Sequence, residues 1–298
     1  MKCISFFLAA VLLLFLFCSC GAPAQRWDIA ATTLPVYEFT SRLCEGSGLS
    51  VTRLVTESVS CLHDYSLNVR QVRAVESADL IVISGAGLEE FMEDILSGKQ
   101  SIDASVGIEL TQCEEEHDHS HDHDHDHHHD VDSHIWLSPE NAAVMADNIC
   151  KGLCAAYPDF SELFKSNLSA LLADIDAVQK YGNEQLSSLS CRDVVTFHDG
   201  FGYFAESFDL HILKAVEEES GAEASAAELK ELIQLVREHQ LPAIFTESNG
   251  SDSAASVCQS EAGAALEGGK PETGRNAEAE AGGRIAEPDV YLRRRKLD

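Results

Sequence analysis

The amino-acid sequence predicts an α/β fold with two lobes, each a mostly parallel sheet with flanking helices, joined by one long helix. Three observations predict it. Short apolar runs alternate with helical patterns from Trp27 onward, which is typical of parallel sheets covered on both faces. One apolar stripe of helical period then runs from about Asp159 to Leu189. A second strand–helix pattern begins after it, at Asp193.

An export signal is expected before the fold. Lys2 gives a positive start, and the apolar run from Ile4 to Phe17 is too short and too early for a membrane span. Ser19 directly before Cys20 resembles a bacterial lipobox, in which the cysteine is lipidated, although Phe17 stands where such boxes usually carry Leu. We therefore expect residues 1–20 to be a signal peptide with a lipobox and Cys20 to carry the lipid anchor. Ordinary cleavage is the alternative.

The first lobe is expected to span residues 27–137. Its strands are apolar runs that end at turn residues, and we place them at 28–33, 51–55 and 80–84. Its helices follow these runs, at 36–43, 69–76 and 88–96.

Composition changes sharply at residues 114–132, which hold eight His, nine acidic residues and one apolar residue. Such a segment cannot bury enough apolar surface to order itself, so it predicts a flexible loop. Its imidazoles could capture Zn²⁺ weakly and pass it to a tighter site, whereas a solvated charged loop is the alternative reading. These histidines are His117, His119, His121, His123, His125, His127, His128 and His129.

Residues 138–190 are expected to form the linking helices. Ser138 can cap a helix that starts at Pro139. The next helix would be roughly 45 Å long at 1.5 Å per residue if Gly182 does not break it, because it reaches from about residue 159 to 189.

The second lobe is expected at residues 191–263, with strands at 193–197 and 243–246 and an amphipathic helix at 226–239. After Gly263 the apolar periodicity disappears and Gly, Ala and Glu dominate. Residues 264–298 are therefore an atypical tail, either disordered or the product of an altered reading frame.

Charge and cysteine content restrict the function. The formal net charge of −29 disfavours nucleic acid as a partner, since its phosphates select Lys and Arg. Cys150 and Cys154 share one face of a helix and are read as small buried residues. An exported location permits disulfides, but the sequence does not assign pairs.

Three histidines stand apart from the loop, and each follows a strand end or lies at a turn: His63, His134 and His198. Ligands of open α/β sheets bind at the carboxyl ends of strands, so two imidazoles from the first half and one from the second can meet between the lobes. Neutral imidazole suits Zn²⁺, and a carboxylate or water completes a tetrahedron. A satisfied core or surface residue is the alternative for each histidine taken alone. Acceptors for the second ring nitrogens could be Asp64, Asp132 and Asp199.

The motifs around these histidines resemble those of the zinc-uptake group of metal-binding receptors that serve bacterial ABC transporters. The resemblance covers about Asp28 to Gly263. Its motifs are Thr32–Pro35, His63–Tyr65, Ser84–Glu89, Asp132–Pro139 and Phe197–Phe204, of which the last two are long and specific.

This resemblance implies two α/β lobes joined by a rigid helix, with the three histidines as metal ligands. Histidine rather than Glu as the third ligand implies Zn²⁺ in preference to Mn²⁺. The group's fourth ligand is an Asp in a Leu-Asp-x-Leu-like stretch, and no such stretch follows Gly263; Asp289 lies in a different context. The fourth position is left open between water and Glu247, which in this group matches a residue of the lobe interface and not a usual ligand.

The function implied is an extracytoplasmic receptor that delivers Zn²⁺ to an ABC permease, not an enzyme. We expect a monomer that is lipid-anchored at the outer face of the cell membrane or periplasmic. A surface adhesin or a metal-storage lipoprotein is the first alternative. A zinc hydrolase is the second, and the sequence lacks a His-Glu-x-x-His signature for it.

Overall fold

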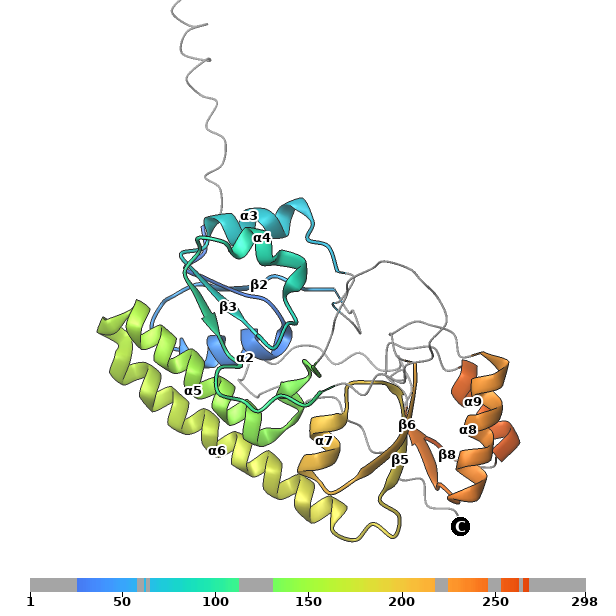
Figure 1. Cartoon of the computed structure of the whole chain (residues 1–298). Helices are drawn as coiled ribbons and strands as arrows, with labels where there is room; N and C mark the ends of the chain where they lie inside the picture. Colours follow the sequence, from blue (N-terminus) through green and yellow to red (C-terminus); the bar gives the residue numbers. More distant parts are fainter. Residues whose placement is uncertain are drawn as a thin grey trace, which may run out of the picture.

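Two four-stranded parallel sheets with the same strand order form the framework (Figure 1). The computed structural model describes residues 26–57, 62, 65–112, 131–217, 225–245, 253–262 and 265–267. The first sheet has the order β2-β1-β3-β4 and the second β6-β5-β7-β8. The strand order reverses between β1 and β3 in the first sheet and between β5 and β7 in the second, and α/β proteins bind ligands at the carboxyl ends of strands at such a point. The strands are β1 (Ile29–Ala31), β2 (Val51–Arg53), β3 (Leu80–Ile83), β4 (Ser101–Asp103), β5 (Asp193–His198), β6 (His211–Glu217), β7 (Ala243–Phe245) and β8 (Ala265–Glu267).

Helices cover both faces of the first sheet. Along β3, Leu80 and Val82 pack into the cluster that contains residues of α2, α5 and α6, whereas Ile81 packs into the opposite cluster with Val75 of α3. Both faces are buried, which explains the continuous apolar run of this strand. The helices of the first lobe are α2 (Leu34–Leu43), α3 (Val69–Ser77), the 3₁₀ helix η1 (Glu90–Met92) and α4 (Glu93–Leu96).

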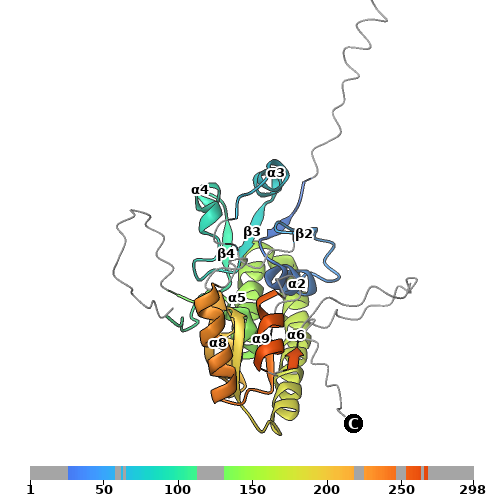
Figure 2. The same ribbon diagram turned by 90° about the vertical axis from the view of Figure 1, so that its right-hand side faces the viewer.

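Two long helices, α5 (Pro139–Ala156) and α6 (Ser161–Leu186), lie side by side below the first sheet, and α6 continues to the second (Figures 1 and 2). Ser138 caps α5 as predicted, since its Oγ accepts a hydrogen bond from Asn141 N at 3.3 Å. A 3₁₀ turn, η3 (Pro158–Phe160), joins the two helices. With 26 residues, α6 is about 39 Å long.

Gly182 does not break α6, because the helix continues to Leu186. The glycine instead makes room for the second lobe: a Cβ there would lie 2.2 Å from Cε1 of Phe208, a buried side chain just after α7 (Gly202–Ser207). The apolar stripe predicted along this helix included Val178 as its last residue. This part of the prediction was wrong, because Val178 is 48 % exposed.

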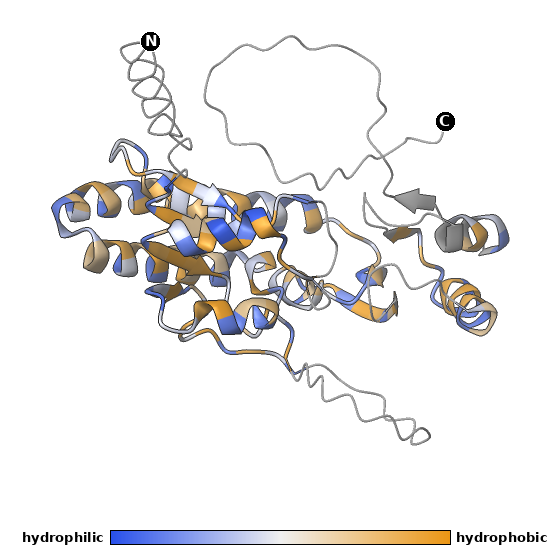
Figure 3. Ribbon diagram, turned by 90° about the horizontal axis from the view of Figure 1, so that it is seen from above, coloured by the Kyte–Doolittle hydropathy of each residue, from blue (hydrophilic) through white to orange (hydrophobic). Residues whose placement is uncertain are grey.

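The second sheet packs against α8 (Ala226–Glu238) and α9 (Ser253–Ala262). Val195 and Phe197 of β5 share a core with Leu232 of α8 and Cys258 of α9. Ser225 and Glu228 form a capping box that fixes the start of α8. In Figure 3, α8 carries apolar residues on one side and polar residues on the other.

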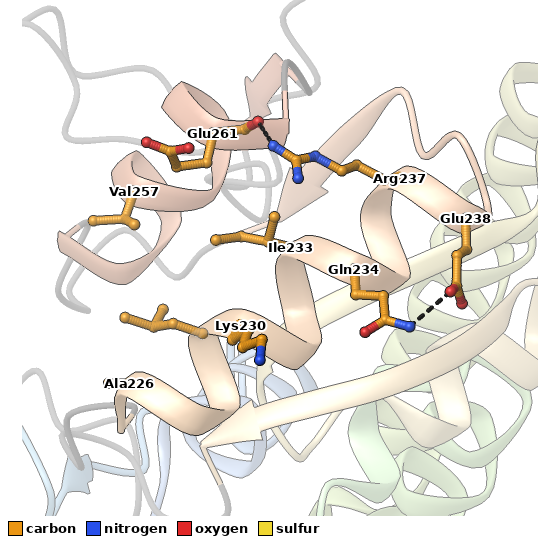
Figure 4. Close-up of a pocket in the computed structure, with 9 residues that line it drawn as sticks. Ala226, Lys230, Ile233, Gln234, Arg237, Glu238, Val257 and Glu261 are labelled. Carbon is orange, nitrogen blue, oxygen red and sulfur yellow. Dashed lines mark hydrogen bonds between the residues drawn. The ribbon is translucent and has the colours of Figure 1, made fainter.

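A groove runs between α8 and α9, and Figure 4 shows its lining side chains, among them Ile233 and Val257. Across it, the Arg237 guanidinium donates a hydrogen bond to the backbone carbonyl of Glu261. None of the predicted metal ligands lines this groove.

Several elements differ from the prediction. Residues 88–96 form η1 and α4 rather than one helix. At their start, the Glu89 side chain turns back along the chain and accepts a hydrogen bond from Ser84 N. Strands β4 and β6 and helix α7 were not predicted. Strand β8 pairs with β7 beyond Gly263, where the second lobe was expected to end. Within the described ranges, no helix is both long and apolar enough to cross a membrane.

Candidate metal centre

Two of the three predicted ligands, His134 and His198, lie among the described residues, and the structure brings them together. His63 and Glu247 lie outside the described residues, as do Cys20 and the eight histidines of the predicted capture loop. The described part of the predicted metal centre is therefore the His134–His198 pair with the residues that hold it.

His198 is the last residue of β5, the first strand of the second sheet. Its position at the carboxyl end of this strand is the switch point of that sheet, where α/β proteins bind ligands. Its side chain is buried, with 6 % exposed. Two residues earlier, Thr196 pairs with Phe245 of β7, so the end of β7 lies beside the end of β5.

His134 comes from the other half of the chain, directly before the short 3₁₀ helix η2 (Ile135–Leu137). Ile135 is completely buried in the core beneath the first sheet, and it fixes the turn that carries the histidine. The Trp136 ring lies 5.3 Å from the His134 imidazole, centroid to centroid. The ring is thus held between a buried anchor and an aromatic neighbour.

The two imidazoles point at each other, with 3.1 Å between His134 Nε2 and His198 Nε2. In a tetrahedral zinc site with Zn–N bonds of 2.0–2.1 Å, two ligand nitrogens lie about 3.3 Å apart. The separation therefore fits two ligands of one ion, and without metal one Nε2–H can donate to the other nitrogen. A Cβ on Gly200 would lie 2.8 Å from His198 Nε2 and 2.9 Å from His134 Cε1, so only glycine lets the main chain pass this close to both rings.

Asp132 holds His134 in a ligand-competent form. Its Oδ1 lies 2.8 Å from His134 Nδ1 and 2.9 Å from the backbone N of the same residue. A carboxylate only accepts hydrogen bonds, so Nδ1 carries a proton, and in the neutral imidazole Nε2 then presents its lone pair to the gap. This arrangement of carboxylate, histidine and open nitrogen is the one that orients metal-bound histidines. Of the other acceptors suggested by the sequence, Asp199 is exposed and Asp64 lies outside the described residues.

A buried carboxylate, Glu89, occupies the switch point of the first sheet, and sequence reasoning assigned it no role. Its Oε1 accepts hydrogen bonds from Thr32 Oγ1 at 2.5 Å and Ser84 N at 2.7 Å, and its Oε2 accepts one from Gly85 N at 3.0 Å. Burial raises the pKa of this carboxyl to about 7, against these hydrogen bonds, which lower it. Glu89 thereby joins the residues that follow β1 and β3 at the carboxyl edge of the first sheet.

Leu62, directly before His63, and Tyr65, two positions after it, lie among the described residues. Leu62 is buried in a cluster with Val55 and Leu88, against which Trp136 also packs. The Tyr65 hydroxyl donates to Glu57 Oε2 at 2.8 Å and accepts from Gln71 Nε2 at 2.6 Å. Leu62 and Tyr65 therefore share one apolar cluster with Trp136, which lies two positions after His134.

The described residues supply two nitrogen donors and their support. No group of three potential metal-binding side chains is found among the parts of the chain that the structure describes. The donor set is soft enough for Zn²⁺ and unlike the all-oxygen sites preferred by Mg²⁺ or Ca²⁺.

Comparison with known proteins gives consistent matches. A family model described as zinc-uptake complex component A, periplasmic (ZnuA), matches residues 29–287. The zinc-binding lipoprotein AdcA of Streptococcus pneumoniae serotype 4 is 32 % identical over 271 residues, which are 88 % of this chain and 54 % of that protein. The chain thus spans about half the length of this relative. The high-affinity zinc uptake system protein ZnuA of Bacillus subtilis is 31 % identical over 259 residues, covering 84 % of this chain and 79 % of that one.

A solved structure is similar as well. The Zn(II)-bound ZnuA-like domain of Streptococcus pneumoniae AdcA superposes with a TM-score of 0.67 at 27 % identity, covering 82 % of this chain and 87 % of that chain. The fold is therefore shared over most of this chain.

Proposed function

Because this chain belongs to the ZnuA family of zinc-uptake components, we propose that it is an extracytoplasmic receptor that binds one Zn²⁺ and delivers it to an ABC permease. The observation that carries the proposal is the 3.1 Å approach of His134 Nε2 to His198 Nε2. One histidine comes from the linker before α5 and the other from the second sheet, so the ion would be bound between the lobes.

His63 is the third ligand in this proposal. The anchoring of Leu62 and Tyr65 supports it, because Leu62 shares an apolar cluster with Trp136, next to the His134 turn. The fourth position is taken by water or by Glu247, which follows the end of β7 by two residues. The pairing of Thr196 with Phe245 supports Glu247 as a candidate, since it brings β7 beside the strand that carries His198.

Transport, rather than hydrolysis, is the role that the proposal assigns to the bound ion. The described carboxylate nearest the pair, Asp132, is committed to orienting His134 and is not positioned as a general base. A receptor binds its ion without turnover, so the purified protein should not hydrolyse esters or peptides with Zn²⁺ present. A storage protein would bind many equivalents with similar affinity, whereas a receptor shows one dominant equivalent.

The proposal includes the location of the protein. The chain is exported and attached to the membrane through a lipid on Cys20. It is a monomer, and its residues 114–132 bind Zn²⁺ weakly near the tight site. Replacing Cys20 by Ala should move the protein from the membrane fraction to the soluble fraction. An unchanged distribution would remove the anchor from the proposal.

The proposal as a whole is tested in the host cell. Deleting the gene should reduce growth in zinc-chelated medium, and the wild-type gene should restore it. A gene with His198→Ala should not restore growth, although the variant protein should be present at wild-type levels. Full restoration by this variant would contradict the proposal.

A further inference from the structure

Tyr203 is buried in the core of the first lobe, although it belongs to α7 of the second. Only 4 % of the residue is exposed, and it packs in the cluster formed by the first sheet with α2, α5 and α6. Tyr203 follows His198 by only five positions. The segment that delivers one ligand from the second sheet therefore ends in a side chain inserted into the opposite lobe.

Both hydrogen-bonding capacities of the Tyr203 hydroxyl are used at one place. It accepts a hydrogen bond from Thr111 N at 2.9 Å and donates one to Asp132 O at 3.2 Å. Thr111 and Asp132 are themselves paired, since Asp132 N donates to Thr111 O at 2.9 Å. The hydroxyl thus joins two backbone segments beside the metal centre, and Gln112 and Val131 continue their pairing as an antiparallel bridge.

The main chain of Asp132 is consequently fixed at both its N–H and its C=O, and its side chain holds His134. The start of α7 adds a steric limit, because a Cβ on Gly202 would lie 3.2 Å from Asp132 Oδ2. A continuous path of contacts therefore runs from Tyr203 through Asp132 to the His134 imidazole.

We propose that Tyr203 is a positioning residue for zinc binding: its hydroxyl fixes Asp132, which in turn holds His134 Nε2 opposite His198 Nε2. By this arrangement the second lobe supplies one ligand directly and orients the ligand of the first lobe through Tyr203. The proposal rests on zinc binding at this pair, which is the proposed function.

Tyr203→Phe tests the proposal, because it removes only the hydroxyl. Tyr157→Phe is the matched control: the Tyr157 hydroxyl also donates to a backbone carbonyl at 3.2 Å, that of Asp28, and its ring packs against the same core. Zinc affinity would be measured on the full chain by competition with a chromophoric chelator. Outer-shell partners of metal-bound histidines typically contribute 10–100-fold in affinity, so one step further out we expect a loss of about tenfold.

Co²⁺ in place of Zn²⁺ provides the second readout, since its visible absorption reports ligand geometry. Tyr203→Phe should change the Co²⁺ bands, whereas Tyr157→Phe should keep both the wild-type bands and the wild-type zinc affinity. Thermal unfolding of the metal-free proteins would show whether both variants lose similar stability.

Two results would overturn the inference: wild-type zinc affinity and Co²⁺ bands in Tyr203→Phe, or equal losses in the two variants, which would indicate a general effect of stability. If the wild-type chain itself shows no tight zinc equivalent, the proposed function fails and the inference fails with it. If wild type binds zinc tightly and Tyr203→Phe binds it equally well, the inference about Tyr203 fails but the proposed function stands.

Discussion

The carboxylate of Asp132 lies 2.8 Å from Nδ1 of His134, and this contact determines that Nε2 is the nitrogen facing His198. The imidazole is therefore oriented before any ion arrives. Asp193, at the other end of β5 from His198, makes two contacts of the same kind. Its carboxylate lies 3.2 Å from His211 Nδ1 and 3.3 Å from His239 Nδ1. The two aspartates make a matched test of position.

Replacing Asp132 by Ala should weaken zinc binding by about 10- to 100-fold, because the ring loses the acceptor that sets its tautomer and orientation. Asp193→Ala also removes aspartate–histidine contacts, but exposed ones away from the metal centre, and should leave zinc affinity unchanged. Chelator competition measures both. Equal effects of the two substitutions would show that the Asp132 contact has no special role.

Glu89 should make the free energy of unfolding depend on pH. The pKa of its carboxyl is about 7 in the folded protein, above its ordinary value of 4.5, so the folded state binds the proton more tightly. The contribution of Glu89 to stability should therefore be fully present below about pH 4.5, fall as pH rises towards 7, and then level off, with a total change on the order of 3 kcal/mol.

Urea unfolding across this range measures the effect. In Glu89→Gln this contribution should disappear. The free energy of unfolding of wild type minus that of the variant should therefore decline as pH rises. The exposed substitution Glu45→Gln should keep the wild-type dependence. Parallel curves for wild type and Glu89→Gln would show that this carboxyl does not titrate as its burial implies.

Gly182→Ala should destabilise the protein although alanine favours helices. The methyl group would lie 2.2 Å from the buried Phe208 ring, and overpacking of this kind outweighs a propensity gain of about 1 kcal/mol, for a net loss of about 1–2 kcal/mol. Ser166→Ala, at an exposed position of α6, should not destabilise it. Phe208→Leu should recover part of the loss when combined with Gly182→Ala. Thermal unfolding decides, and no loss in Gly182→Ala would contradict the close packing of α6 on the second lobe.

Removing the predicted capture loop should preserve the tight site. Gln112 and Val131 already form an antiparallel bridge, so deletion of residues 115–130, with Cys113→Asn and Glu114→Gly, leaves a two-residue hairpin turn. Isothermal titration should then show one tight zinc equivalent and no weak ones. Loss of the tight equivalent in the shortened protein would contradict a division of labour between the loop and the centre.

Two of the predicted elements, strand β3 and helix α5, carry strong local signals in the sequence. The run of β3 and the capped start of α5 at Ser138 were predicted because burial and capping leave local signals. Strand β4 has three residues, and its first, Ser101, is exposed, so no comparable signal marks it. Residues 88–96 were predicted as one helix because the apolar spacing does not show that Glu89 turns back to Thr32 and Ser84.

The candidate centre was predicted in a similar way. The motifs around His134 and His198 predicted that these two side chains meet, and their Nε2 atoms lie 3.1 Å apart; Asp132 was a named acceptor and contacts His134. Tyr203 was not recognised, because its role depends on a contact with Asp132 that is 71 positions away in sequence. The roles of His63 and Glu247 remain predictions, since both lie outside the described residues.

The central claim, one zinc ion bound by three histidines, is tested most directly by chelator-competition titration of Zn²⁺, with Mn²⁺ as competitor. The proteins are wild type, His63→Ala, His134→Ala, His198→Ala and, as control, His239→Ala, whose exposed imidazole lies beside Asp193. We expect one tight equivalent in wild type and in the control, not displaced by Mn²⁺. Each of the other three variants should lose more affinity than the roughly 10- to 100-fold typical of an outer-shell residue. Wild-type affinity in His134→Ala and His198→Ala would contradict zinc binding at this pair, and wild-type affinity in His63→Ala alone would remove His63 as the third ligand.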